Sequence, residues 1–324
     1  MPQLLLHIGI PRTATSLIQS FLAKNAGRLR ANGIFLGSRH PRAFAETQAI
    51  YDDGRRGEEL AKSLIDRSQG AHAILLSDED LSRRLRLAPL SDFAKHFSGV
   101  KVIVALRRQD LWLESWYLQN IKWQWDTALA KLTLRQFLDR RDQFHWIDYD
   151  LLMGRLSEFF GDNNIVPFVF EKEMMPGGPV THFCRLLGIN SIDGWTKGDN
   201  ENVSLSPVYA EFLRQLPLLD FPDPIKVHLE AACLEIHKEA KDNLSPRESS
   251  PLLIEHDERQ RILDSFESGN RSVARSYFSR EALFLEGMPD PTSEIGRLEL
   301  PPPNELMSRL VAPYVKALVK RVTK

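Results

Sequence analysis

Apolar and polar positions along the chain form short blocks that predict strands and helices in alternation. Four short apolar runs are typical of buried strands: residues 3–9, 72–77, 101–106 and 164–170. Helices are predicted between them, the first over residues 15–31, before a C-cap sequence at Asn32-Gly33. This alternation predicts an α/β fold in which helices cover both faces of a parallel sheet. Ligands of such sheets bind beyond the carboxyl ends of the strands.

The segment LLLHIGIPRTATSLI at residues 4–18 contains the first of these strand ends. Gly9 and Pro11 interrupt the apolar run, and a helix is predicted to begin near Thr15. The first N–H groups of a helix lack intrahelical partners and attract anions. The loop also carries a cation and three hydroxyls: Arg12, Thr13, Thr15 and Ser16. These features predict a phosphate-binding loop, and the alternative is an ordinary turn with an incidental arginine.

The same loop is similar to a Walker A sequence but lacks its lysine. In the pattern G-x-x-x-x-G-K-[ST], Gly9 takes the first position and Ser16 the last. Ala14 stands at the second glycine and Thr15 at the lysine. Because a Mg²⁺-dependent NTPase needs that lysine on the β- and γ-phosphates, ordinary ATP or GTP hydrolysis is disfavoured. An atypical P-loop kinase stays open as an alternative.

A second strand end lies in KVIVALRRQDLWLESWYLQN, residues 101–120. Arg107 closes the apolar run, Asp110 fits a helix N-cap, and Ser115 follows on the first turns of the helix. An arginine offers phosphate oxygens a planar fork of donors, and a serine adds a neutral donor. The pair predicts a second phosphate contact. The alternative is that Arg107 pairs with a surface carboxylate and Ser115 is merely exposed.

The loop P-R-T-A-T-S at residues 11–16 resembles the 5′-phosphosulfate loop of sulfotransferases that use 3′-phosphoadenosine 5′-phosphosulfate (PAPS), written P-K-T-G-T-[ST]. Arg12 replaces the lysine, as it does in some tyrosylprotein sulfotransferases, and Ala14 replaces the glycine. The family also carries an arginine and a serine at the separation of Arg107 and Ser115. The chain thus resembles the soluble bacterial type of this family.

Weaker similarity continues downstream of these motifs. Residues 149–188 read as helix, strand, loop and helix, which is the family's order, and ENVSLSP at 201–207 resembles a stretch before its C-terminal helices. The resemblance therefore covers about residues 3–215. We predict a PAPS-binding core over residues 1–215 and a mainly helical C-terminal extension over 216–324, packed on the same domain.

The resemblance implies a P-loop-like three-layer fold and transfer of a sulfuryl group from PAPS to an acceptor hydroxyl, with adenosine 3′,5′-bisphosphate (PAP) as product. Arg107 and Ser115 would hold the 3′-phosphate, and Arg12 would stabilise charge on the leaving oxygen. The 5′-phosphosulfate would lie on the whole loop: Arg12, Thr13, Ala14, Thr15 and Ser16. No metal is expected, because the cationic side chains replace Mg²⁺. Carbohydrate, lipid-linked glycan and small alcohol stay open as acceptors.

A third strand end supplies the candidate general base. The apolar residues 73–76 precede SDEDLS at 77–82, where bacterial members of the family often show a Ser-x-Glu stretch. Glu79 is therefore the candidate base that takes the proton of the acceptor hydroxyl, with Asp78 as the second choice. The alternative for Asp78 or Asp80 is to cap the next helix.

Net charge, cysteine spacing and the start of the chain give expectations about nucleic-acid binding, redox state and location. The formal net charge of −1 gives no bulk attraction to nucleic acid. Cys184 and Cys233 have no ligand or redox spacing and are expected to be reduced and buried. Three residues precede the apolar run that starts at Leu4, and this run is too short to span a membrane. We therefore expect no signal peptide, no transmembrane segment and a cytoplasmic location.

The end of the chain is predicted to be a basic amphipathic helix over residues 305–324. Such a helix packs on its own domain or on a second subunit of a homodimer, or lies on a membrane surface, and these alternatives stay open.

A second class of function also stays open: a non-catalytic nucleotide-binding protein with a degenerate sulfotransferase fold. Arg12 and Ala14, which depart from the family's loop, support that alternative.

Overall fold

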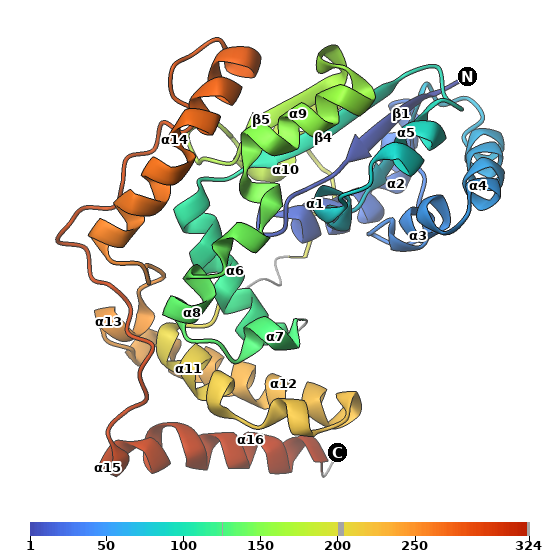
Figure 1. The fold of residues 1–324 in the computed structure, drawn as a ribbon. Helices are drawn as coiled ribbons and strands as arrows, with labels where there is room; N and C mark the ends of the chain where they lie inside the picture. Colours follow the sequence, from blue (N-terminus) through green and yellow to red (C-terminus); the bar gives the residue numbers. More distant parts are fainter. Residues whose placement is uncertain (125, 200–203, 323–324) are drawn as a thin grey trace. The chain divides into compact units, whose positions relative to one another are not determined.

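The computed structural model describes residues 1–124, 126–199 and 204–322 (Figure 1). The chain divides into two compact units that alternate along the sequence. The first unit comprises Met1–Arg108, Phe144–Glu201 and Ser265–Gly287. The second comprises Gln109–Gln143, Asn202–Asp264 and Met288–Lys324. The predicted division of the chain into residues 1–215 and 216–324 assigns one continuous segment to each part, and it stays a prediction. Residues 201–203 of the ENVSLSP stretch lie outside the described residues, as do residues 323–324.

The first unit contains a five-stranded parallel sheet with the order β2-β3-β1-β4-β5. Its strands are β1 (Gln3–His7), β2 (Ile34–Leu36), β3 (Ala73–Ser77), β4 (Val100–Leu106) and β5 (Ile165–Val169). The four predicted strands are confirmed with ends shifted by one or two residues. The three-residue β2 is too short to give an apolar run of its own. This order, with β1 between its neighbours at the centre, confirms the predicted P-loop-like α/β class.

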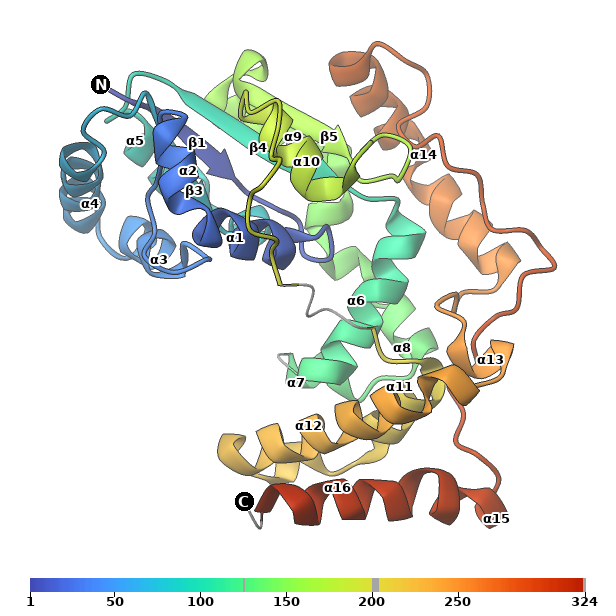
Figure 2. The ribbon, with the colours of Figure 1, turned by 180° about the vertical axis from the view of Figure 1, so that it is seen from behind.

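Helices cover both faces of this sheet, as Figures 1 and 2 show from opposite sides. One face packs on α1 (Thr15–Lys24), α2 (Ala26–Ala31) and α10 (Gly178–Leu186). The other face packs on α9 (Tyr149–Phe160), with α5 (Ala88–Ala94) beside it. The remaining elements of the unit are α3 (Phe44–Asp52), α4 (Gly54–Arg67), η1 (Glu79–Arg83), η3 (His145–Ile147), η4 (Asp162–Asn164) and the C-terminal part of α14 (His256–Phe278). Both faces of β1 are therefore buried, which explains its uninterrupted apolar sequence.

The helix predicted over residues 15–31 is two helices, because it breaks at Asn25. The side-chain amide of Asn25 donates to the carbonyls of Phe21 and Thr196, at 2.8 Å in each case, and its oxygen accepts from the N–H of Thr196. An asparagine that bonds the backbone in this way competes with the regular helix. The predicted end at Asn32-Gly33 is confirmed, with Gly33 in the left-handed region at φ 76°.

The second unit is helical. Its elements are α6 (Gln109–Trp123), α7 (Thr127–Ala130), α8 (Leu134–Leu138), η2 (Arg141–Gln143), α11 (Pro207–Gln215), η5 (Leu218–Asp220), α12 (Asp223–Ala240), η6 (Lys241–Asn243), α13 (Pro246–Ser249), the start of α14, α15 (Pro303–Leu306), the π-helical turn η7 (Met307–Val311) and α16 (Ala312–Val322). The terminal helix α16 packs on α12, where the Tyr314 hydroxyl lies 3.3 Å from the carbonyl of Leu229. Contact of this end with a membrane or a second subunit stays a prediction.

A buried ion cluster anchors α6 within the second unit. Arg259 is 1% exposed and bonds the carboxylates of Asp110 and Glu114, with 2.6 Å to Glu114. Glu114 also accepts the N–H groups of Leu253 and Ile254. Asp110 is therefore not the N-cap that the sequence predicted: α6 begins at Gln109, and the Asp110 carboxylate binds Arg259.

Two further observations concern the cysteines and the apolar character of the helices. Cys184 and Cys233 are both buried and neither forms a disulfide in the described part of the chain. Among the described helices, none combines the length and the apolar composition needed to cross a membrane.

Candidate functional site

Three loops meet at the carboxyl edge of the sheet around β1. β1 lies between β3 and β4, and its last residue, His7, is level with Ser77 of β3 and Ile103 of β4. The chain leaves β1 toward β2 at one edge and leaves β4 toward β5 at the other. A parallel sheet opens a crevice at such a switch point, and ligands bind there. The loop with Arg12 follows β1, and Arg107 follows β4 directly.

The loop after β1 is tight and adopts a left-handed backbone at two positions. A Cβ atom on Gly9 would lie 2.1 Å from Cγ2 of Thr15, so glycine is needed there for space. Arg12 has φ 70° and Ala14 has φ 60°. Ala14 is the N-cap of α1 and has no side chain with which to bond the first N–H groups of the helix. Where the resembling loops have glycine, this chain thus holds an alanine at positive φ, at a cost of about 1–2 kcal/mol.

The two candidate phosphate-binding arginines come together in this structure. A terminal nitrogen of Arg107 donates to the backbone carbonyl of Arg12 at 2.7 Å. Burial, and after it the nearby charge of Arg107, lower the pKa of Arg12 to about 10. The charge of Arg107 near Arg12 makes this place favourable for an anion. The β1–β4 crevice is therefore the candidate anion site.

Tyr149 fixes the backbone of Arg107. Its hydroxyl donates to the carbonyl of Arg107 and accepts the N–H of Arg107 at 3.0 Å. Tyr149 is the first residue of α9 and is buried, which raises the pKa of its hydroxyl. The guanidinium of Arg107 also lies 5.8 Å from the ring centroid of Phe170, just after β5. Arg107 is therefore positioned by residues from two other elements of the first unit.

The hydroxyl-bearing candidates occupy different environments. Thr13 is buried, and its hydroxyl donates to the carbonyl of Ile10 at 2.6 Å, within the loop. Thr15 is buried beside Gly9, and Ser16 is exposed on the first turn of α1. Ser115 is half-buried on α6 of the second unit. Contacts of these four residues with a ligand stay predictions.

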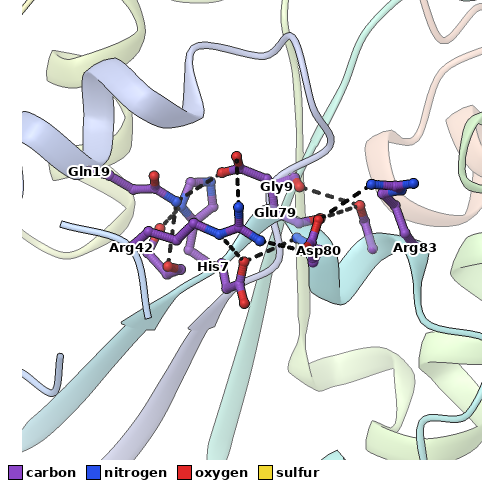
Figure 3. A network of polar contacts seen from close by, with 10 residues as sticks. His7, Gly9, Gln19, Arg42, Glu79, Asp80 and Arg83 are labelled. Atoms are coloured by element: carbon purple, nitrogen blue, oxygen red, sulfur yellow. Dashed lines mark hydrogen bonds and ion pairs between the residues drawn. The ribbon is translucent and has the colours of Figure 1, made fainter. Parts of the chain in front are cut away.

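On the other side of β1, the residues after β3 form an acidic network around Arg42. Nε of Arg42 lies 2.6 Å from Asp78, and its terminal nitrogens reach Asp80 and, at 3.8 Å, Glu79. Figure 3 shows the Arg42 guanidinium among these side chains. Asp78 is fully buried and caps η1 by accepting the N–H of Asp80. The guanidinium of Arg42 thus forms ion pairs with all three carboxylates.

Glu79 and Asp80 are the carboxylates of this network that a ligand could reach. The side chain of Glu79 is 16% exposed and that of Asp80 is 29% exposed, whereas that of Asp78 is 0% exposed. Gln19 of α1 donates to Glu79 at 3.0 Å and so links the acid to the helix of the phosphate loop. Burial raises the pKa of Glu79, against the opposing charge of Arg42, and the like charge of Asp78 raises it further. A raised pKa and partial exposure suit a general base better than the buried, capping position of Asp78.

His7, at the end of β1, is structural. Its ring is fully buried, with Nδ1 2.8 Å from the hydroxyl of Ser77. Burial lowers the pKa of His7 to about 3, so the imidazole is neutral at physiological pH. It lies under the loop, where its Nε2 would be 3.0 Å from a Cβ on Gly9.

Sequence reasoning missed the residues that hold the site together. Arg42, Gln19 and Tyr149 carry no local motif, and each lies far along the chain from the residue it contacts. Sequence reasoning also missed the contacts that hold the last segment of the first unit. Arg108 donates to the carbonyls of Glu286 and Gly287 at 2.7 Å. Glu171 accepts the N–H groups of Leu285 and Glu286. Arg108 and Glu171, each two residues after a strand, are buried charged residues, and nothing in the sequence indicated that burial.

Comparison with known proteins adds little to this geometry. No protein-family model matches the chain. An uncharacterized protein of Archaeoglobus fulgidus is 24% identical over 215 residues, which cover 65% of this chain and 54% of that protein. The chain thus spans about half the length of the curated relative it matches. A crystal structure of a sulfotransferase from Alicyclobacillus acidocaldarius superposes with a TM-score of 0.42 and 15% identity, covering 70% of this chain and 99% of that one. Function therefore has to come from the residues of the site.

Proposed function

We propose that the protein is a sulfotransferase that uses PAPS as donor. The observation that carries this proposal is the convergence of Arg12 and Arg107 at the β1–β4 crevice, beside a helix whose N-cap has no capping side chain. Two half-buried cations and a first helical turn whose N-cap has no capping side chain suit a ligand with two anionic groups. PAPS has two such groups, a 5′-phosphosulfate and a 3′-phosphate.

Each residue has a distinct task in this proposal. Arg12 and the first N–H groups of α1 hold the 5′-phosphosulfate, and Arg107 holds the 3′-phosphate. The acceptor oxygen attacks sulfur in line, the bond from sulfur to the bridging oxygen breaks, and PAP leaves with that oxygen. Arg12 stabilises the negative charge that develops on it. Glu79 takes the proton that the acceptor hydroxyl gives up, which its raised pKa favours.

Two alternatives make different demands on the same site. A P-loop kinase would need a cation at position 15, where the chain has a buried threonine. A non-catalytic binding protein would bind PAP and leave PAPS intact, and the strained Ala14 favours neither reading on its own. The acceptor would be a hydroxyl compound, with carbohydrate, lipid-linked glycan and small alcohol as the candidate classes.

Calorimetry and a turnover assay separate these functions. The full chain is titrated with PAP, with adenosine 5′-phosphate and with ATP plus Mg²⁺ at one ionic strength. We expect PAP to bind most tightly, and tighter binding of ATP with Mg²⁺ would instead favour the kinase. A cell extract treated with the protein and labelled PAPS then reports transfer. Label in an acceptor supports the enzyme, whereas bound PAP without transfer indicates the binding protein.

A further inference from the structure

A second cationic site lies next to the candidate base, on the far side of η1. A hollow of about 260 Å³ is lined by Asp80, Arg83, Arg84 and Trp146. Asp80 and Arg83 belong to η1, the same turn that begins with Glu79. A molecule seated in this hollow would therefore extend along the turn that carries the base.

Aromatic rings hold the two arginines of the hollow. The guanidinium of Arg83 lies 5.1 Å from the ring centroid of Trp146, and that of Arg84 lies 4.7 Å from the ring of Tyr51 on α3. Stacking of this kind fixes the plane of a guanidinium, and at Arg84 its N–H edge can meet an oxyanion. Among the described residues, no carboxylate lies within ion-pairing distance of Arg84, which is half-buried.

Further guanidinium groups surround the same place. Arg155 of α9 donates to the backbone carbonyls of Arg84 and Leu85, so its charge adds to the cluster. Burial lowers the pKa of His145, and the charges of Arg155 and Arg83 lower it further. Burial also raises the pKa of Tyr51 to about 12, against the charges of Arg84, Arg155 and Arg86. The carboxylate that lines the hollow, Asp80, is shared between Arg42 and Arg83, so positive charge is in excess here.

We propose that this hollow binds an anionic substituent of the acceptor, a phosphate or sulfate ester, while an acceptor hydroxyl reaches Glu79. The role as an acceptor site rests on the proposed sulfotransfer, whereas anion binding by the hollow does not. The stacked guanidinium of Arg84 presents a fork of donors that matches the oxygens of such an ester, and Arg83 and Arg155 add positive charge nearby. The acceptor class that fits is a phosphorylated or already sulfated sugar or alcohol, in preference to a neutral one.

Titration of the full chain with three sugars tests this site. The probes are glucose 6-sulfate, glucose 6-phosphate and, as the neutral control, glucose, each added with the PAP site saturated by PAP. We expect at least one ester to bind and glucose not to bind, and the better ester identifies the source of the anion. Binding of neither ester, or equal binding of glucose, would overturn the proposal.

Variants locate the bound ester. Arg84→Gln should weaken ester binding at least about tenfold, the effect of one lost charge-assisted hydrogen bond. Arg56→Gln removes the same charge from an exposed site on α4 and should leave ester binding within about twofold of the parent. Equal losses in both variants, or no loss in Arg84→Gln, would place the anion elsewhere. Arg83→Gln provides a second substitution at the hollow if Arg84→Gln fails to fold.

The same titrations keep this inference apart from the proposed function. PAP affinity should be unchanged by Arg84→Gln, because the hollow and the Arg12–Arg107 site use different residues. If PAP does not bind the parent protein but ester binding depends on Arg84, the donor assignment fails and the anion site stands. If PAP binds and the esters do not, the anion site fails and the donor assignment stands.

Discussion

On one side of β1, the carboxylates of Asp78, Glu79 and Asp80 gather around the cation of Arg42. On the other side, the cation of Arg107 lies against the loop of a second cation, Arg12. The acidic side thus supplies its own counter-charge, with further bonds from Gln19 and the backbone. The cationic side brings like charges together.

The difference bears on which side suits an anionic ligand. Burial, and after it the charge of Arg107, lower the pKa of Arg12, and an anion bound in the crevice would raise it again. Across β1, burial raises the pKa of Glu79 against the opposing charge of Arg42. The proposed donor site and the proposed base thus lie on opposite sides of one strand, and substitutions at the two places should have separable effects.

The largest effect is expected at Glu79, where activity and stability should move in opposite directions. Glu79→Gln should lower turnover by about 10²–10⁴-fold, since it removes a general base, and should leave PAP affinity unchanged. Because burial raises the pKa of Glu79, wild-type stability should fall as pH rises from the ordinary carboxyl pKa through the raised one. The variant lacks that loss and should unfold at a higher urea concentration at neutral pH. Wild-type turnover should rise with pH over the same window.

Asp78→Asn and Asp80→Asn are the matched controls for that experiment. Asp78 caps η1 and bonds Arg42, so its substitution should reduce stability. If either control is inactive while the Glu79→Gln protein stays active, the general base is misassigned, and another carboxylate of the acidic side takes the proton.

Arg12 tests whether the cationic side supports chemistry as well as binding. Arg12→Ala should lower turnover by about 10²–10³-fold, the scale of a lost donor to a developing oxyanion. Arg12→Lys should keep part of the activity, because it retains the charge but not the planar fork. Lysine has the lower ordinary pKa, so the activity of this variant should decline at a lower pH than that of the parent. A fully active Arg12→Ala protein would remove Arg12 from the reaction.

Arg107 tests recognition of the 3′-phosphate. Arg107→Ala should weaken PAP binding by about 1.5–3 kcal/mol, and binding of adenosine 5′-phosphate should change much less. Arg108→Ala is the matched neighbour: its side chain holds the carbonyls of Glu286 and Gly287, so it should cost stability but keep the preference for PAP. Equal losses for both nucleotides in Arg107→Ala would contradict the assignment.

The smallest effect is expected at Ala14. Ala14→Gly should relieve a left-handed alanine that costs about 1–2 kcal/mol, offset by about 0.5–1 kcal/mol of added chain entropy in the unfolded state. A net gain of about 0.5–1 kcal/mol in the free energy of unfolding should follow, with improved PAP binding if the strain resists closure of the loop. Ala23→Gly within α1 is the control and should destabilise by about the glycine helix penalty. A loss of stability in Ala14→Gly would show that the position is not strained.

The sequence by itself determined the elements and the chemistry at their ends. Uninterrupted apolar runs predicted four of the five strands, because both faces of a covered parallel sheet are buried. A glycine, a cation and a helix start in succession predicted the loop with Arg12, and the residue after another apolar run predicted Arg107. These features are local, so short stretches of sequence contain them.

Tertiary structure decided what those residues contact. Only the strand order brought Arg12 beside Arg107, and only the packing of distant segments brought Arg42 to Asp78 and Tyr149 to Arg107. The same holds for Asp110: its carboxylate binds the buried Arg259, 149 residues away, and does not cap the helix as predicted. Charge balance and burial set the pKa values of Arg12 and Glu79, and both depend on contacts between residues far apart in the chain. Local pattern thus predicted which groups lie at the edge of the sheet, and folding determined which residues each of these groups contacts.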